Sequence, residues 1–321
     1  MVVLTKKKRK LKKGVYKFLV LLIIVGLLGY SGIKLYKDYK YKQTYEYKLL
    51  QHGYKLEEVK ILEKNFDNKR LDWLLSVPKN KTVLNLLKEK YYIANKLDDY
   101  LAYEKENANL SLTEIVLKVN TLTNYDFYEH TIESDISKGI LLNCNKYYRL
   151  PEDYVPEDLV TINTNYAFGT RQATKETVDA YINMWNAAKE NGIHLMVNSA
   201  YRSYSDQEAV YNSYKAKNGE AYADKYAARP GHSEHQTGLS LDIFSIDNTS
   251  TKTFENSAAY AWLKDNAHKY GFILRYSKDK ENITGYSFEA WHYRYVGVEA
   301  ATKVYEDDIT YDEYYAYYIE K

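Results

Sequence analysis

The sequence predicts an α+β domain, built on a short antiparallel sheet flanked by helices, that follows a transmembrane helix and a small helical stalk. Three observations support this order. An apolar run lies near the N-terminus, a segment rich in Leu, Lys and Glu at helical spacing follows it, and helix and strand patterns alternate from about residue 136 onward. A length of 321 residues leaves room for an anchor and one or two folded units. We therefore expect segments at 1–14, 15–36, 37–135 and 136–321.

The first two segments predict a single-pass membrane protein. Residues 1–14 are a basic tail, and the apolar run at 15–36 approaches the roughly 20 residues that a helix needs to cross a bilayer. Because a cluster of Lys and Arg stays on the cytoplasmic side, we expect the tail to be cytoplasmic and the chain after Lys37 to be extracellular. A cleaved signal peptide is the alternative, but its apolar region would be shorter and would end at a small-residue site of the A-x-A type, which this sequence lacks.

The charge of the chain argues against a nucleic-acid partner. The formal net charge is only +2, and many of the basic residues crowd into the N-terminal tail. A basic tail can bind nucleic acid, but directly before a membrane-length apolar run it more often fixes topology. We therefore expect no nucleic acid among the partners and one contact with the membrane, through the N-terminal helix.

Residues 37–135 are predicted to form a helical stalk or adaptor. Leu56, Val59 and Leu62 recur at the spacing of one helix face, and a similar pattern lies at 83–91. Pro78 interrupts the pattern, so we expect two or more helices. The simplest interpretation is a spacer between the lipid and the next domain, and binding of a partner or polymer is the alternative.

The α+β domain begins to show regular elements with a helix at about 175–191. Val178 and Tyr181 lie on its apolar face, and Gly192 follows its C-terminus, a common position for glycine. Alternating apolar residues at 193–197 then predict a strand.

Arg202 follows this strand in a loop. Ser205 and Glu208 have the spacing of a capping box, which predicts that another helix opens there. Arg202 is thereby placed between a strand and a helix, which is a common location for functional groups.

A further strand follows a polar turn at Gly238. Leu239, Leu241 and Ile243 share one face of this strand, so Asp242 lies on the other face. A helix at 257–270, a strand at 272–276 and a turn at 284–285 are expected next, before a final motif at 288–295. The acidic, tyrosine-rich segment at 307–318 is predicted to be a packed segment, without an assigned function.

Three residues of this domain have the types and spacing of a zinc site. His235 and Asp242 lie seven positions apart around Gly238, which can bring an imidazole and a carboxylate to one ion. Catalytic zinc sites commonly use three protein ligands and leave one position for water. His292 is the candidate third ligand, because Glu289, three residues before it, supplies the base that a metallopeptidase requires for the metal-bound water. Each signal is weak alone, and the joint pattern is what carries weight.

Three blocks of this domain stand out together: Tyr201-Arg202-Ser203, Ser233 to Gly238 with Asp242, and Glu289 to Tyr295. Their order and spacing resemble those of the VanY-like D-alanyl-D-alanine carboxypeptidases. Residues 145–151, 154–156 and 159–160 are similar to the start of that family's domain, so the resemblance covers roughly 141–297. Ala290 stands where many relatives have Pro, which alters backbone stiffness and leaves the chemical groups intact.

The resemblance implies a small zinc peptidase domain at 136–321 that binds one Zn²⁺ ion per chain. The metal ligands that it implies are His235, Asp242 and His292. It implies Glu289 as the general base and Arg202 as a catalytic group that binds the substrate's carbonyl or carboxylate. Gln207 and Ser233 are implied as further substrate contacts.

The physical chemistry agrees with these roles. Zinc held by two neutral imidazoles and one carboxylate keeps a positive charge, which lowers the pKa of its water and polarises a carbonyl. Glu289 would take the proton from this water and deliver it to the leaving amine. The planar guanidinium of Arg202 can clamp a carboxylate at two points or stabilise an oxyanion. In a regular strand Glu289 and His292 would face opposite sides, so we expect a turn or bulge between them.

The predicted function is removal of a terminal D-alanine from peptidoglycan stem peptides at the outer face of the cell membrane, with D,D or L,D specificity. One alternative is a peptidoglycan endopeptidase of the same fold. Another is a catalytically inactive, anchored wall-binding protein, although such a module has little reason to keep a base beside an open metal position. His232 and His268 lie outside the pattern, and we expect a structural position for His232 and a surface position for His268.

Overall fold

A computed structural model of the protein describes residues 13–320. Packing divides the chain into two compact units, Met1–Lys88 and Glu89–Lys321. Helices α6 (Leu97–Glu106) and α7 (Leu112–Asn120), which the sequence places in the stalk, belong to the second unit by this division. The functional boundary near residue 136 stays a prediction.

The first unit begins with helix α1 (Lys13–Lys42), which is longer than the predicted span at 15–36. None of its residues is buried. Within residues 13–320, it is the one helix that is long and apolar enough to cross a membrane by length and composition. The first twelve residues of the predicted basic tail lie outside the described part of the chain.

Four short helices complete this unit. They are α2 (Tyr45–Gln51), α3 (Leu56–Asn65), α4 (Asn68–Ser76) and α5 (Lys81–Leu86). Val59 and Leu62 are fully buried, as their spacing predicts, but Leu56, the first residue of α3, is exposed. Pro78 lies in the break between α4 and α5. The side chains of Asp67 and Asn80 accept hydrogen bonds from the first turns of α4 and α5, which fixes where these helices begin.

The second unit contains a four-stranded antiparallel sheet of order β5-β6-β8-β7. Its strands are β5 (Leu195–Ser199), β6 (Ser240–Ser245), β7 (Phe272–Leu274) and β8 (His292–Tyr295). Two small sheets accompany it, formed by β1 (Ile132–Glu133) with β2 (Tyr148–Arg149) and by β3 (Leu159–Ile162) with β4 (Arg171–Thr174). The predicted α+β class is confirmed.

The two faces of the four-stranded sheet differ in chemistry. Leu241 and Ile243 of β6 belong to the main core together with side chains of helices α8 (Lys175–Glu190) and α11 (Ala258–Asn266). Because side chains alternate along a strand, Asp242 points to the opposite face. The pairing of β6 with β8 sets Asp242 directly beside His292 and Ser240 beside Arg294. One face of the sheet therefore packs on the core, and the other carries polar groups.

The strand predicted at 193–197 begins two residues later, at Leu195, because Ile193 takes part in the hydrogen bonds that end helix α8. Gly192, at φ +76°, reverses the chain after α8. The N–H groups of Ile193 and Gly192 then donate to the carbonyls of Ala188 and Lys189, the hydrogen-bond pattern of a Schellman cap. Ile193 thus completes the helix end, and β5 starts at Leu195.

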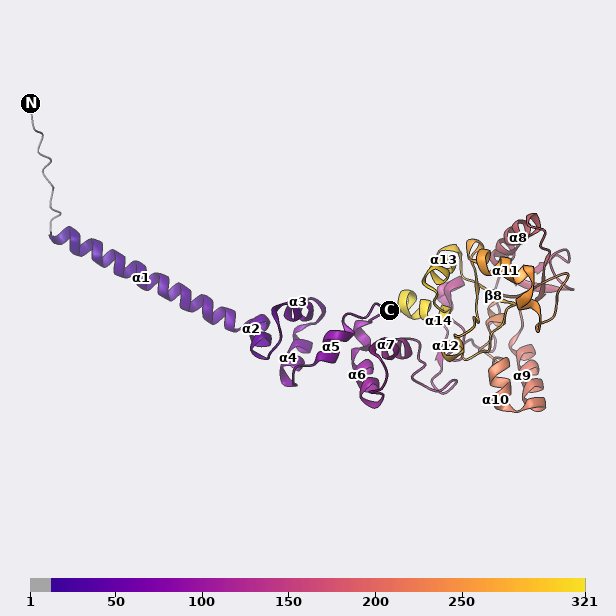
Figure 1. Ribbon diagram of the computed structural model, residues 1–321, viewed down its shortest axis with the longest axis horizontal. Helices are drawn as coiled ribbons and strands as arrows, with labels where there is room; N and C mark the ends of the chain where they lie inside the picture. The colour runs from indigo at the N-terminus through magenta and orange to yellow at the C-terminus, as the bar shows by residue number, and fades with distance from the viewer. Residues whose placement is uncertain (1–12, 321) are drawn as a thin grey trace, which may run out of the picture. The chain divides into compact units, whose positions relative to one another are not determined.

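Helices α9 (Tyr204–Asn218) and α10 (Glu220–Tyr226) lie side by side (Figure 1). The predicted capping box at Ser205 and Glu208 is wrong. Ser203 caps α9 instead, and its hydroxyl accepts from the N–H of Asp206.

The other elements of this unit are short. These are η1 (Ala94–Lys96), η2 (Ile136–Leu141), η3 (Glu234–Thr237), η4 (Phe254–Asn256), η5 (Ala267–Tyr270), α12 (Glu281–Thr284), α13 (Val298–Asp307), α14 (Tyr311–Tyr314) and η6 (Tyr315–Ile319). The acidic, tyrosine-rich tail is packed, as predicted, because Tyr311 and Tyr315 are buried.

Candidate active site

The three predicted metal ligands meet in space. His235 lies on η3, Asp242 on β6, and His292 is the first residue of β8. One ligand atom from each residue lies within 4.8 Å of the other two. Gly238, at φ +67°, turns the chain from η3 into β6, and a Cβ there would come within 3.0 Å of Leu159. The structure thus forms a cluster that could hold a metal ion.

The hydrogen bonding of His235 leaves a lone pair directed at a carboxylate. Its Nδ1 lies 2.7 Å from the carbonyl oxygen of Ala200, so this nitrogen carries the proton and donates. Burial lowers the pKa of His235, which favours the neutral ring. Its Nε2 then faces Oδ2 of Asp242 at 3.5 Å with a lone pair. Two electron-rich atoms in contact are stabilised by a cation between them.

His292 repeats this arrangement with its nitrogens exchanged. Its Nε2 faces Oε2 of Glu234 at 3.3 Å, so this nitrogen donates. Its Nδ1 lies 3.3 Å from Oδ1 of Asp242, an oxygen that is buried without a hydrogen-bond partner among residues 13–320. Burial alone lowers the pKa of His292, but contacts with Asp242 and Glu234 raise it to about 9. The cluster therefore attracts positive charge, either a proton or a metal ion.

Asp242 keeps its negative charge in this setting. Burial opposes ionisation, but the rings of His235 and His292 hold the pKa of Asp242 well below its usual range. The cluster thus offers two nitrogen donors and an ionised carboxylate.

The side chains of Glu289 and His292 reach the same cavity, because the turn expected between the two residues is present. Ala290 and Trp291 form this turn, and the N–H of His292 donates to the carbonyl of Glu289 at 3.3 Å. Oε2 of Glu289 comes within 3.7 Å of Nδ1 of His292. Burial raises the pKa of Glu289 to about 7. A carboxyl group with this pKa can both accept and return a proton near neutral pH.

Arg202 is held in place by the protein. Its guanidinium donates to Oε1 of Gln207 at 2.8 Å and to Oγ of Ser199 at 3.0 Å. The amide nitrogen of the buried Gln207 in turn donates to the carbonyl of Ala228 at 2.7 Å. The amide oxygen of Gln207 thus holds Arg202, while its amide nitrogen is held by the backbone. Contacts of Arg202 and of Gln207 with substrate stay predictions.

All of the predicted site residues line one cavity of about 210 Å³. They are Arg202, Gln207, Ser233, His235, Asp242, Glu289 and His292. Aromatic side chains of the connecting loops complete the wall, among them Tyr276, Tyr286 and Trp291. The cavity thus combines an ion-binding cluster, a carboxyl group and a guanidinium, which together suit metal-assisted hydrolysis of an amide bond.

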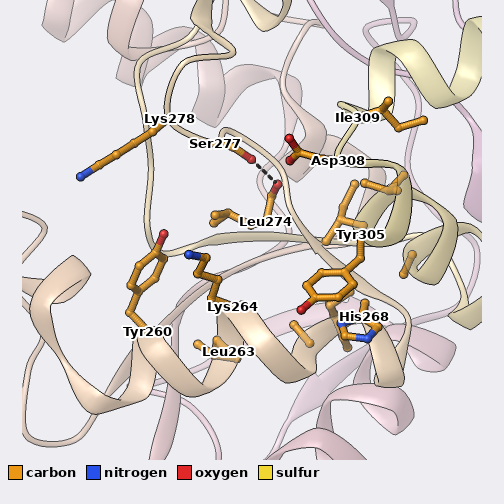
Figure 2. Close-up of a pocket in the computed structure, with 15 residues that line it drawn as sticks. Tyr260, Leu263, Lys264, His268, Leu274, Ser277, Lys278, Tyr305, Asp308 and Ile309 are labelled. Carbon is orange, nitrogen blue, oxygen red and sulfur yellow. Dashed lines mark hydrogen bonds between the residues drawn. The ribbon is translucent and has the colours of Figure 1, made fainter.

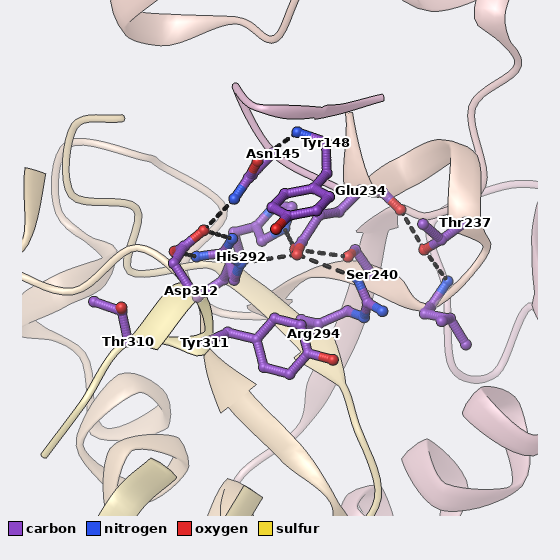
Figure 3. A network of polar contacts seen from close by, with 12 residues as sticks. Asn145, Tyr148, Glu234, Thr237, Ser240, His292, Arg294, Thr310, Tyr311 and Asp312 are labelled. Carbon is purple, nitrogen blue, oxygen red and sulfur yellow. Dashed lines mark hydrogen bonds and ion pairs between the residues drawn. The ribbon is translucent and has the colours of Figure 1, made fainter. Parts of the chain in front are cut away.

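A group of buried charged residues supports His292 from behind, and it was not predicted from the sequence (Figure 3). Oε1 of the buried Glu234 accepts from Nε of Arg275 at 2.8 Å and from a terminal nitrogen of Arg294 at 3.1 Å. Burial opposes ionisation of Glu234, but the two arginines hold its pKa well below the usual range. Arg294 could have been found from sequence, because it lies two residues after His292 on one strand face. Arg275 carries no such signal.

A second cavity, of about 330 Å³, lies among α11, η5, β7 and α13 (Figure 2). His268 lies in it with its ring stacked on Tyr305 at 3.8 Å between centroids, so this residue is half-buried rather than fully exposed. None of the predicted site residues is in its lining. His232 is buried, with Nδ1 2.7 Å from the carbonyl oxygen of Asn145, in the structural position expected for it.

Known proteins share this domain. Residues 170–298 match the family model of VanY, D-alanyl-D-alanine carboxypeptidase. The chain is 43% identical over 184 residues to the putative carboxypeptidase YodJ of Bacillus subtilis, which covers 56% of this chain and 67% of the relative. The chain belongs to the VanY family of carboxypeptidases. A further relative is a D-alanyl-D-alanine carboxypeptidase of Enterococcus faecium, 33% identical over 208 residues, with 62% of this chain and 65% of the relative covered.

Solved structures confirm the fold of this VanY-family domain. The LdcB LD-carboxypeptidase aligns with a TM-score of 0.56 at 40% identity, covering 59% of this chain and 91% of that one. The vancomycin resistance D,D-dipeptidase VanXYg aligns with a TM-score of 0.50 at 33% identity, covering 55% of this chain and 70% of that one.

Proposed function

We propose that this VanY-family protein removes a terminal D-alanine from peptidoglycan stem peptides with one Zn²⁺ ion held by His235, Asp242 and His292. The observation that carries the proposal is the geometry of the cluster, in which one nitrogen of each histidine faces Asp242 while its other nitrogen donates elsewhere. The names of the relatives support the substrate class, since they are D-alanyl-D-alanine and LD-carboxypeptidases.

The donor set suits zinc. Two imidazole nitrogens and one carboxylate oxygen form a ligand set that catalytic zinc accepts, with a fourth position left open. When bound, the ion supplies a Lewis acid that makes a water molecule more acidic and polarises the scissile carbonyl. Glu234 orients His292 from behind, and the carbonyl of Ala200 orients His235.

The remaining steps fall to the protein's own side chains. Glu289 takes a proton from the attacking water and returns it to the amine of the departing D-alanine. Arg202, fixed by Gln207 and Ser199, binds the terminal carboxylate or the oxyanion that develops on the carbonyl. Ser233, in the wall of the same cavity, is a candidate for a further contact with the peptide.

L,D specificity is a second candidate. The structure of LdcB, an LD-carboxypeptidase, aligns with this chain at 40% identity and a TM-score of 0.56. The same site would then release D-alanine from an L-centre rather than from another D-residue.

We place this activity outside the cell. Helix α1 has the length and composition of a membrane anchor, and the basic tail precedes it. By the distribution of positive charge, the tail is cytoplasmic and the carboxypeptidase domain faces the wall.

The test uses the full chain in detergent with defined tetrapeptide and pentapeptide stems, and mass spectrometry of the products. We expect loss of one D-alanine, abolished by a chelator and restored by Zn²⁺. Release of a larger fragment would indicate an endopeptidase. Zinc-loaded protein that cleaves neither stem would support the inactive wall-binding alternative.

A further inference from the structure

The buried ion network behind His292 continues to the C-terminal helix α14 (Figure 3). The guanidinium of Arg275 donates through Nε to Glu234, and its two terminal nitrogens donate to Asp312 at 2.7 and 3.0 Å. Arg275 is 1% exposed and Asp312 is 4% exposed. One guanidinium therefore joins a carboxylate beside the proposed metal site to a carboxylate in the tail.

The two oxygens of Glu234 have different duties. Oε1 accepts from both arginines, Arg275 and Arg294. Oε2 is left to face Nε2 of His292 and the hydroxyl of Ser240, each at 3.3 Å. Arg275 and Arg294 thus together hold the orientation of the Glu234 carboxylate, and Asp312 holds the far side of Arg275.

The charges of this network cancel. Arg275 and Arg294 carry two positive charges, and Glu234 and Asp312 carry two negative charges. Asn145 also donates to Asp312, so this carboxylate is satisfied on both oxygens. Loss of the Asp312 charge would leave a net positive charge buried beside the proposed cation site, where screening by water is weak.

We infer that Asp312 is a positioning residue of the proposed zinc site, which acts through Arg275 and Glu234 on His292. The inference rests on the proposed function and goes beyond it, because Asp312 lies outside the family match at 170–298. With Asp312 present, Arg275 is shared between two carboxylates and Glu234 keeps an oxygen for the imidazole N–H. This hydrogen bond orients the ring and strengthens its other nitrogen as a ligand.

Asp312→Asn in the full chain tests this role. The substitution keeps the shape of the side chain and removes its charge. We expect zinc affinity, measured by chelator competition, to fall about tenfold or more, within the range found for groups that support metal ligands. At saturating zinc, kcat on a D-alanine-terminated stem peptide should fall while KM stays within about twofold, since Asp312 does not line the cavity.

Glu313→Gln is the matched control. Glu313 is the next residue of α14, is 7% exposed, and caps the helix by accepting from the N–H of Thr310 at 2.7 Å. In the described part of the chain, the side-chain hydrogen bonds of Arg275 go to Glu234 and Asp312 and not to Glu313. We expect this variant to keep wild-type zinc affinity even where its melting temperature falls. An equal loss of affinity in both variants would reduce the Asp312 effect to helix stability and overturn the inference.

A double-mutant cycle separates the path through Glu234 from a general effect. If Asp312 acts through Glu234, Asp312→Asn should lower zinc affinity in the wild type but add less than about twofold in a Glu234→Gln background. A full, additive loss would contradict the path. Arg275→Lys, which keeps the charge but cannot reach both carboxylates, is expected to reproduce the loss and serves if Asp312→Asn does not fold.

Failure of the positioning role of Asp312 can be told apart from failure of the proposed function. Wild-type protein that binds no zinc, or that cleaves no stem peptide when loaded, would refute the proposed function. Wild-type protein that does both, with an Asp312→Asn variant of equal zinc affinity, would refute the positioning role alone.

Discussion

At the scale of single residues, Glu289 and His292 are three positions apart and have different proposed duties. Glu289→Gln removes the proposed base and keeps the donor cluster of His235, Asp242 and His292. We expect zinc to stay near one equivalent per chain while kcat falls by about a hundredfold or more, the usual cost of losing general-base catalysis. His292→Ala should lower both zinc content and activity. Metal analysis and peptide turnover on both purified variants check this, and loss of zinc from Glu289→Gln would make the carboxylate a ligand.

Arg202 allows a second test at this scale. Arg202→Lys keeps the positive charge but loses the planar group that reaches Gln207 and Ser199 together. We expect kcat/KM to fall roughly 10- to 100-fold, about 1.4 to 2.7 kcal/mol, with zinc content unchanged. Arg171→Lys, at a position outside the cavity, is the control. Equal activity of Arg202→Lys and wild type would show that another group binds the carboxylate.

His232 gives the stability a pH dependence of its own. Burial lowers its pKa to about 4, against the ordinary value of 6.5. Between these values the unfolded chain binds a proton that the folded chain excludes, so His232 destabilises the fold progressively as pH falls from about 6.5 to 4. The full effect is up to about 3 kcal/mol. Urea unfolding at pH 7.5 and pH 5 should show a smaller drop in His232→Gln than in the wild type, and identical drops would contradict this account.

At the scale of elements, the turn from η3 into β6 places His235 against Asp242. Gly238→Ala would strain the positive φ and push a methyl group to 3.0 Å from Leu159 and 3.2 Å from Thr174. Gly192→Ala is the matched control, because its φ is +76° and no heavy atom lies within 4 Å of the added carbon. We expect about 1 kcal/mol of destabilisation at Gly192 and about 1 to 3 kcal/mol more at Gly238. Thermal melts of both variants measure the difference. Equal shifts in melting temperature would mean that Leu159 and Thr174 move aside without loss of stability.

The elements also show what sequence can and cannot predict. Strand alternation placed Asp242 on the polar face, and motif spacing singled out His235 and His292, because both signals are local. The start of β5 and the cap of α9 were misplaced, since Schellman bonds at Ile193 and the choice between two nearby serines depend on backbone geometry. Which residues would bind the substrate was taken from a resemblance; the geometry adds a hydrogen bond from Arg202 to Gln207, and the contact of Gln207 with substrate stays a prediction.

The network from Asp312 to Glu234 shows more clearly what a sequence pattern cannot predict. Arg275, Glu234 and Asp312 lie far apart in sequence and share no period or motif. Their contact is a result of tertiary packing, which brings α14 against the polar face of the sheet. A sequence pattern can place a residue on a face, but it does not say which distant residue will cover that face.

At the scale of the whole molecule, the proposed membrane anchoring and orientation of the chain can be tested. Protease added to intact protoplasts should release a fragment containing the carboxypeptidase domain, because the basic tail precedes α1 and the rest of the chain follows it. The control is protoplasts lysed with detergent, in which both sides of the membrane are accessible. Complete protection in intact cells and digestion after lysis would reverse the predicted orientation.

The pairing of Asp242 with His292 across β6 and β8 makes the donor cluster a test of correct folding. Side chains alternate in a sheet, so a slip of one residue would set Asp242 opposite Tyr293 or Trp291 and turn the polar face toward the core. A misaligned molecule would then lack the cluster even if its secondary structure looked normal. Retention of one tightly held zinc per chain would therefore report that the strands of a given preparation are in register, before any substrate is added.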